Sequence, residues 1–95
     1  MFQIEYRKDS QIVSLIGKLD SSKTGEANEV LEKIENSFTI DMSKLDFICS
    51  AGIGTLVNTY SRLKKKGENV HLVNLNSHIK KVFEVSCLDT VFDIK

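Results

Sequence analysis

The side chains most able to do chemistry stand together at Cys49-Ser50-Ala51-Gly52, directly before a predicted helix. The first backbone N–H groups of a helix lack intrahelical partners, and a serine oxygen there can accept a hydrogen bond from one of them as the N-cap. A phosphate on the same hydroxyl would meet these donors and the positive end of the helix dipole. It would also add about −1.5 to −2 charges in one step, enough to repel a bound partner. We therefore predict that Ser50 is the N-cap of this helix, a phosphorylation target, or both.

Cys49 offers a different chemistry, because thiolates are favoured near helix N-termini and can act as nucleophiles. A nucleophile needs a base, and the only histidines are His71 and His78. We expect both rings at the surface, one on a predicted strand and one in the first turn of a predicted helix. Neither the histidines nor Cys49 and Cys87 have metal-ligand spacing. We therefore expect no enzyme, metal or cofactor, and cysteines that are either reduced or joined in one disulfide.

The composition is that of one globular domain spanning residues 1–95, with 41% hydrophobic and 27% charged residues. Its 13 basic and 13 acidic side chains cancel, which disfavours nucleic acid and anionic membranes as partners. Arg62 and residues 64–66 form a basic run, which we interpret as a solvated helix end that complements the helix dipole rather than a nucleic-acid site. No apolar run approaches the length of a membrane span, and the first residues do not resemble a signal peptide. We therefore expect a cytoplasmic protein without membrane insertion.

Alternating apolar residues predict strands over residues 2–6 and 12–16, joined by a turn at 8–10 as an antiparallel hairpin. A short strand is predicted over 38–42, and Leu45, Phe47 and Ile48 continue its apolar character toward Ser50. Residues 70–73 give another strand, and residues 91–94 give a final short strand or docked tail.

Apolar residues at helical spacing predict three helices. The first carries Ala27 to Ile34 and is expected to be capped by Ser21 or Ser22. The second runs from Ile53 to Leu63 and ends at Gly67, a residue suited to a left-handed C-terminal cap. Ser77 is expected to cap the third, whose apolar face carries Ile79, Val82 and Phe83.

The resulting order β-β-α-β-α-β-α-β predicts an α/β fold, with a mixed, largely parallel sheet of four to five strands and helices packed on it. Binding sites in such sheets lie outside the carboxyl ends of the strands. The turn that holds Ser50 is one of these places.

The segment from Asp41 to Gly54, DMSKLDFICSAGIG, resembles the central motif of the STAS domain, the family of bacterial anti-sigma factor antagonists and sulfate-transporter tails. That motif runs approximately as Asp-Leu-Ser-x-Val-x-Phe-Ile-Asp-Ser-Ser-Gly-Leu-Gly. Gly17-Lys18-Leu19-Asp20 is similar to the family's turn before its first helix, and residues 88–94 are similar to its C-terminal ending. The likeness covers essentially the whole chain.

The resemblance implies a partner-switching module. Antagonists of this family bind a serine kinase and anti-sigma factor of the histidine-kinase-like ATPase fold. Phosphorylation inactivates them and a serine phosphatase restores them. Ser50 takes the phosphorylated position, and ATP would belong to the partner, since this chain has no P-loop. The partner-binding surface implied for this chain comprises Asp20, Thr24, Asp41, Ser43, Cys49, Ala51, Gly52, Ile53 and Gly54.

The chain departs from the motif at Cys49, where the family usually has aspartate, and at Ala51, where it has a second serine. A thiol cannot orient a kinase as an acidic side chain could, whereas Ala51 leaves Ser50 as the unambiguous acceptor. The alternative function is a constitutive STAS adaptor in a transporter or sensory assembly, in which Ser50 would be a static cap.

Overall fold

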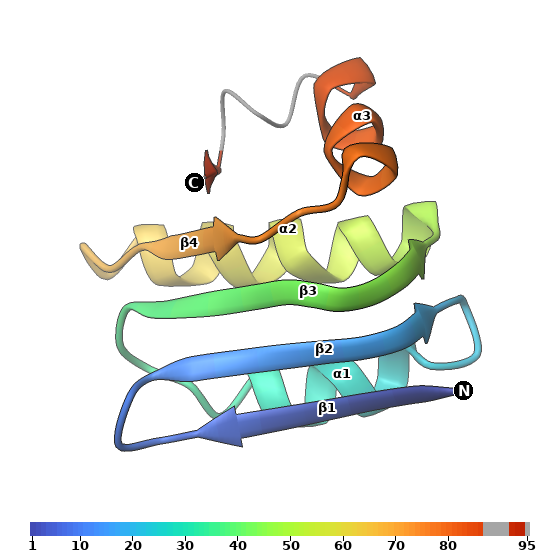
Figure 1. The fold of residues 1–95 in the computed structure, drawn as a ribbon. Helices are drawn as coiled ribbons and strands as arrows, with labels where there is room; N and C mark the ends of the chain where they lie inside the picture. The colour runs from blue at the N-terminus through green and yellow to red at the C-terminus, as the bar shows by residue number, and fades with distance from the viewer. Residues whose placement is uncertain (87–91, 95) are drawn as a thin grey trace.

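The computed structural model describes residues 1–86 and 92–94, which form one sheet with three helices (Figure 1). The elements in chain order are β1 (Phe2–Arg7), β2 (Ile12–Leu19), α1 (Thr24–Leu31), β3 (Phe38–Ile48), α2 (Ser50–Lys64), β4 (Val70–Val73), α3 (Ser77–Val85) and β5 (Asp93–Ile94). The strand order is β1-β2-β3-β4-β5, antiparallel between β1 and β2 and parallel elsewhere. The predicted α/β class, the hairpin and the mixed, largely parallel sheet are confirmed. The expectations that concern Cys87 and Val91 fall outside the described residues.

Helices α1 and α2 cover one face of the sheet, and α3 lies toward its β4–β5 edge (Figure 1). The core between these layers is made of fully buried apolar side chains, among them Leu15, Ile40, Leu56 and Phe83. The alternation that predicted the strands places Leu15 and Ile40 toward the helices. No described helix covers the opposite face of the sheet, which β1 to β4 present to the viewer in Figure 1.

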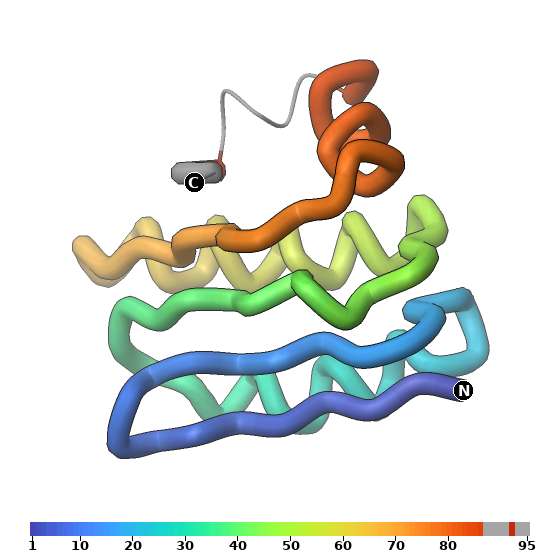
Figure 2. Tube along the Cα trace, viewed as in Figure 1, coloured from blue at the N-terminus to red at the C-terminus, as the bar shows by residue number. Residues whose placement is uncertain are grey.

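Strand β3 is longer than predicted, because the apolar stretch after Met42 continues the same strand to Ile48. Its pairing with β2 contains two register shifts, one between Ser14 and Ile16 and one between Gly17 and Lys18. At each shift β3 carries one extra residue, which is the definition of a β-bulge. Buried residues of β3 therefore change from every second to every third position, and Figure 2 shows the trace bending in this half of the strand.

Two of the predicted helix caps are wrong. The residue before α1 is Lys23, whose side chain makes no capping hydrogen bond, so neither Ser21 nor Ser22 caps this helix. Asn76 caps α3 by accepting a hydrogen bond from the Ile79 N–H at 2.8 Å, which makes Ser77 the first helical residue. In both cases the cap position falls on a residue other than the serine that the sequence favoured.

The predicted end of α2 is confirmed, since Gly67 adopts φ +78° just beyond it. The Gly67 N–H donates to the Lys64 carbonyl at 3.0 Å and the Glu68 N–H donates to the Leu63 carbonyl at 2.9 Å. These two bonds form a Schellman motif, which pairs carbonyls that the helix itself leaves open.

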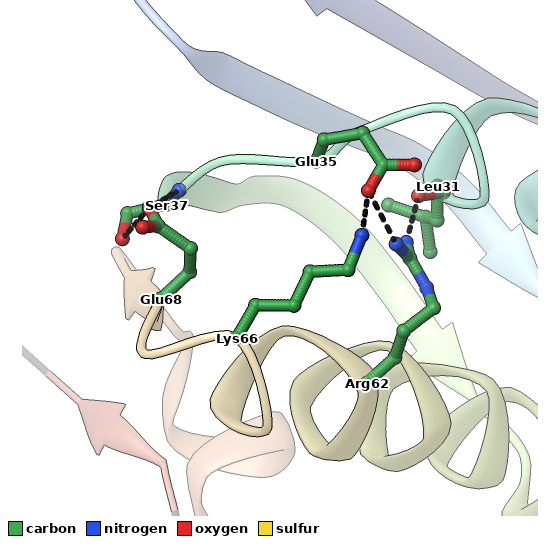
Figure 3. A network of polar contacts seen from close by, with 6 residues as sticks. All are labelled: Leu31, Glu35, Ser37, Arg62, Lys66 and Glu68. Atoms are coloured by element: carbon green, nitrogen blue, oxygen red, sulfur yellow. Dashed lines mark hydrogen bonds and ion pairs between the residues drawn. The ribbon is translucent and has the colours of Figure 1, made fainter.

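The basic side chains near the end of α2 hold two loops together at the amino ends of β3 and β4 (Figure 3). The guanidinium of Arg62 donates to the Leu31 carbonyl at 2.7 Å and lies 3.8 Å from the Glu35 carboxylate, which also pairs with Lys66. The Glu68 carboxylate accepts hydrogen bonds from the Ser37 N–H at 2.7 Å and from its hydroxyl at 2.9 Å. We call these contacts the amino-end network; they give Arg62 and Lys66 a structural role.

Candidate functional site

The carboxyl ends of β2 and β3 lie side by side and bring two turns together. Leu19 pairs with Ile48 at the last register position, and the Cys49 N–H donates to the Leu19 carbonyl at 3.0 Å. The turn that begins at Asp20 therefore adjoins the start of α2. We call this region the Ser50 end; it comprises residues 20–24 and 49–54 and lies at the arrowheads of β2 and β3 in Figure 1.

Helix α2 is capped by Cys49 and not by Ser50. Cys49 has extended backbone angles, φ −91° and ψ 171°, and its Sγ accepts a hydrogen bond from the Gly52 N–H at 3.3 Å. The Ile53 N–H then makes the first helical bond, to the Cys49 carbonyl at 3.0 Å. The prediction of Ser50 as the N-cap is wrong, because the strand continues to the residue before the cysteine and the extended cap position falls on Cys49.

Ser50 is consequently the first residue of α2, and its side chain is exposed. Within residues 1–86 and 92–94 its hydroxyl makes no hydrogen bond. The backbone N–H groups of Ser50 and Ala51 also lie at the open start of the helix, where no preceding turn supplies an acceptor. The hydroxyl is therefore free of a structural role and accessible from solvent.

Gly52 packs the first turn of α2 against the two strand ends. A Cβ atom at this position would lie 2.9 Å from Leu19 Cγ, closer than real Cβ contacts, and 3.0 Å from Ile48 Cγ1, which is also tight. Only a residue without a side chain fits here without displacing the core. Gly54, two positions later, has no neighbour within 4 Å of such an atom, so its surroundings do not demand glycine.

Asp20 organises the turn between β2 and α1. Its Oδ1 accepts hydrogen bonds from the Ser22 hydroxyl at 2.6 Å and from the Ser22 N–H at 3.0 Å. The hydroxyl bond, together with the N–H and the charge of Lys23, lowers the pKa of the Asp20 carboxyl. The Thr24 hydroxyl donates to the Ser21 carbonyl at 3.3 Å in the same turn. Asp20 thus places a stable negative charge at the Ser50 end.

Asp41 and Ser43 do not lie at the Ser50 end, which corrects the placement implied by the linear motif. Asp41 pairs with Ser14 on one side and Val73 on the other, seven residues before the last residue of β3. At about 3.3 Å per residue this separates it from Ile48 by roughly 20 Å. The motif is continuous in sequence, but the extended strand distributes it over two surfaces.

Asp41 instead stabilises the first bulge of β3. Its Oδ1 accepts hydrogen bonds from the Ser43 N–H at 3.0 Å and from the Asn74 side-chain amide at 3.2 Å. Partial burial raises the pKa of the Asp41 carboxyl, but these hydrogen bonds and the nearby charge of Arg7 outweigh it, so the net shift is downward. Asn74 was not singled out in the sequence. It adopts φ +61°, a conformation that asparagine tolerates, so an asparagine directly after a strand is the signal that could have identified it.

The Ser50 end has little of what a nucleophilic enzyme requires. Within the described part of the chain, the Cys49 thiol takes part in one hydrogen bond, which it accepts from the Gly52 N–H. His71 pairs with Thr39 near the opposite end of β3, and His78 is exposed on α3. Among residues 1–86 and 92–94, no group of three or more histidine, cysteine, aspartate or glutamate side chains could hold a metal ion. The described helices also include none with the length and apolarity of a membrane span.

Comparison with known proteins gives a consistent result. A family model described as the STAS domain matches residues 2–95. The chain is 25% identical over 85 residues to the anti-sigma-B factor antagonist of Bacillus subtilis, covering 86% of this chain and 78% of that protein. It is 28% identical over 64 residues to the putative anti-sigma factor antagonist BtrV of Bordetella bronchiseptica, covering 67% of this chain and only 55% of that protein.

Solved structures agree in fold. A putative anti-sigma factor antagonist from Thermotoga maritima superposes with a TM-score of 0.79 at 22% identity, covering 98% of this chain and 84% of that one. The phosphorylated form of the Bacillus cell fate determinant SpoIIAA superposes with a TM-score of 0.73 at 20% identity, covering 100% of this chain and 91% of that one. At these identities the likeness concerns the arrangement of helices and strands.

Proposed function

Because the chain belongs to the STAS domain family, we propose that it is an anti-sigma factor antagonist, a non-enzymatic regulator switched by phosphorylation of Ser50. The observation that carries the proposal is the state of this serine: exposed, first in α2, and relieved of capping by Cys49. A hydroxyl with no structural role can be modified without loss of the fold. The names of the related proteins support the same class of function.

The local electrostatics explain how a phosphate would act at this position. The positive end of the α2 dipole and the open N–H groups of Ser50 and Ala51 would stabilise an anion there. The phosphate would add its charge beside Asp20, which is ionised well below neutral pH. A partner surface that accepts the neutral serine would then have to accommodate a charged group beside Asp20, and burying a charge without a partner of opposite sign is unfavourable.

The partner we propose is an anti-sigma factor that is also a serine kinase of the histidine-kinase-like ATPase fold, with a serine phosphatase to reset the switch. The kinase would supply the ATP site, so this chain needs no cofactor of its own. Its contact surface on this chain would be the Ser50 end, built from Asp20, Thr24, Cys49, Ala51, Gly52, Ile53 and Gly54, and we place the protein in the cytoplasm with that partner.

The first test is phosphopeptide mapping of the protein recovered from its native cells, before and after stress. We expect phosphate on Ser50 with an occupancy that changes between conditions. A protein that carries no phosphate on Ser50 under any condition, yet still co-purifies in a stable complex, would favour the constitutive STAS adaptor.

The second test measures affinity for the co-purifying ATPase-fold partner by calorimetry. Ser50→Asp should weaken binding by more than about tenfold, because it puts a charge at the centre of the contact. Ser61→Asp is the matched control, since Ser61 is an exposed serine of the same helix outside the Ser50 end. Equal affinities for wild type and Ser50→Asp would contradict the switch.

A further inference from the structure

The outer edge of β1 is the longer of the two free edges of the described sheet. The strand order places β1 at one end of the sheet, and no described strand pairs with its outer side (Figures 1 and 2). The strand at the other end, β5, has only two residues. A free edge exposes backbone N–H and C=O groups that can pair with a strand of another chain.

The hydrogen bonds between β1 and β2 determine which backbone groups of β1 face outward. In an antiparallel pair, opposite residues alternate between those that exchange hydrogen bonds and those that do not. The Lys18 N–H donates to the Met1 carbonyl at 2.8 Å, and the β1–β2 register places these two residues opposite each other. Every second residue after Met1 therefore also bonds to β2: Gln3, Glu5 and Arg7. The residues between them direct their N–H and C=O groups to the free edge: Phe2, Ile4 and Tyr6.

Strand β1 has few of the features that protect an edge from pairing. Such features include proline, bulges and a short strand. The chain contains no proline, the β1–β2 register has no shift, and β1 spans six residues. Ile4 and Tyr6 are half-buried against the core, and the two charges of the strand, on Glu5 and Arg7, have opposite signs. The edge therefore retains both hydrogen-bonding groups and apolar surface for another strand.

A second copy of β1 complements this edge in one antiparallel register. With Ile4 opposite Ile4 of the second copy, Phe2 lies opposite Tyr6 on either side, and each of these pairs can exchange two hydrogen bonds. All the outward backbone groups of both strands then have partners. On the open face of the sheet, Gln3 lies opposite Glu5 of the second copy, so that a side-chain amide can donate to a carboxylate, twice by symmetry.

The neighbouring registers are less favourable. A slide in one direction places Glu5 opposite Glu5 of the second copy, and like charges directly opposite each other are destabilising. A slide in the other direction leaves the outward groups of Tyr6 unpaired. The whole chain has a formal net charge of zero, so two copies approach each other without net repulsion.

We propose that two copies of this chain associate through β1, antiparallel and with Ile4 opposite Ile4, to form one continuous sheet. In each copy β1 runs antiparallel to β2 and β3. The β3 strands of the two copies therefore run in opposite directions, and the two Ser50 ends face away from each other. Each Ser50 end stays accessible to a partner of its own. The association uses no residue of the Ser50 end and does not depend on the state of Ser50.

The first test measures amide hydrogen exchange by NMR on the ¹⁵N-labelled full chain. Sedimentation equilibrium gives the dissociation constant, and exchange is then compared well below and well above it. The amides of Ile4 and Tyr6 face solvent in the monomer and form interchain bonds in the dimer, so their exchange should slow by at least about tenfold at the higher concentration. The amides of Gln3 and Glu5, which bond to β2 in both states, should change less.

The second test changes the sign of the charge at Gln3, an exposed side chain. Gln3→Lys places a cation opposite Glu5 of the second copy and should tighten the dimer by about two- to tenfold, whereas Gln3→Glu should weaken it by a similar factor. Ser61→Lys and Ser61→Asp, at an exposed position on α2, make the same changes in net charge away from β1 and should leave the dissociation constant unchanged.

Three results would overturn the proposal. A chain that remains monomeric at its highest soluble concentration has no such interface. A dimer in which the amides of Ile4 and Tyr6 exchange as fast as in the monomer uses another surface, such as the open face of the sheet. Opposite signs for the two Gln3 variants would place Gln3 opposite Arg7 of the second copy and contradict the register.

Discussion

The two ends of the sheet differ in how their polar groups are used. At the amino ends of β3 and β4, the amino-end network joins two loops through the side chains of Arg62, Lys66, Glu35 and Glu68. At the Ser50 end, the hydroxyl of Ser50 and the backbone N–H groups of Ser50 and Ala51 have no partner among the described residues. One end uses its charged side chains for stability, and the other leaves the hydroxyl of Ser50 available for a partner.

This difference is typical of α/β proteins, in which binding sites lie outside the carboxyl ends of strands. The amino-end network connects chain segments about 30 residues apart, as in the bond from Arg62 to the Leu31 carbonyl. Such contacts stabilise the scaffold on which the opposite end is held. Substitutions at the two ends should therefore have separable effects, with stability changed at one and binding at the other.

Gly52 is the exception at the Ser50 end, because it is required for packing. Gly52→Ala should destabilise the protein by about 1–3 kcal/mol, since the added methyl group overlaps Leu19 and Ile48. Gly54→Ala is the matched control: the site is open, and alanine favours a helix over glycine by about 0.8–1 kcal/mol. Urea denaturation of both variants measures the difference. Similar free energies of unfolding for the two would mean that the start of α2 is not packed as described.

Removal of Arg62 should produce the next largest effect. Arg62→Ala removes the side-chain donor of the Leu31 carbonyl and one of the two cations that pair with Glu35. We expect a loss of about 1–2 kcal/mol in the free energy of unfolding, with partner binding unchanged. Lys65→Ala, a neighbouring exposed position, should stay within about 0.5 kcal/mol of wild type. If Arg62→Ala bound the partner more weakly under conditions in which the variant is fully folded, the two ends would be coupled.

Most of the fold could be predicted because the alternation and the helical spacing are determined locally. The two bulges of β3 could not, because a bulge moves buried residues to every third position. Met42, Leu45 and Ile48 then no longer follow the period of a regular strand. Placement of Asp41 and Ser43 beside Ser50 failed for a related reason. Residues close in a motif are carried far apart by an extended strand.

The predicted caps of α2 and α3 failed for the same physical reason. A cap must be the last residue with extended backbone angles, and helix starts are predictable only to within one or two residues. At α2 and α3, two capable residues stand side by side, Cys49 with Ser50 and Asn76 with Ser77. The sequence favoured the serine each time, and the backbone selected the residue before it. At α2 this shift is what leaves Ser50 accessible.

Because Cys49 caps α2, a substitution that strengthens this cap should produce a small gain in the free energy of unfolding. A thiol is a weak acceptor, so Cys49→Asp should stabilise the protein by about 0.5–1 kcal/mol through a stronger cap. Ser50→Ala should change stability by less than about 0.5 kcal/mol, because no structural hydrogen bond is lost. Thermal or urea unfolding distinguishes the two positions. A loss of about 1 kcal/mol in the unfolding free energy of Ser50→Ala, with no change in Cys49→Asp, would show that Ser50 is the N-cap of α2.

The smallest effect is the pH dependence of the amino-end network. The Ser37 N–H and hydroxyl lower the pKa of Glu68 from its ordinary value of 4.5, and Lys66 lowers that of Glu35. A carboxylate whose pKa is lower in the folded state stabilises the protein above the unfolded pKa, and this contribution is lost as the pH falls through the folded pKa. Glu68→Gln keeps the shape and an acceptor for Ser37 but cannot titrate.

The difference in unfolding free energy between wild type and Glu68→Gln should therefore be present at pH 7 and shrink below about pH 4.5. Glu29→Gln, at an exposed position on α1, supplies the comparison for a charge outside the network. If the Glu68→Gln difference instead grew as the pH fell, the ionised carboxylate would destabilise the folded state. The Glu68 contacts of the amino-end network would then not contribute to stability.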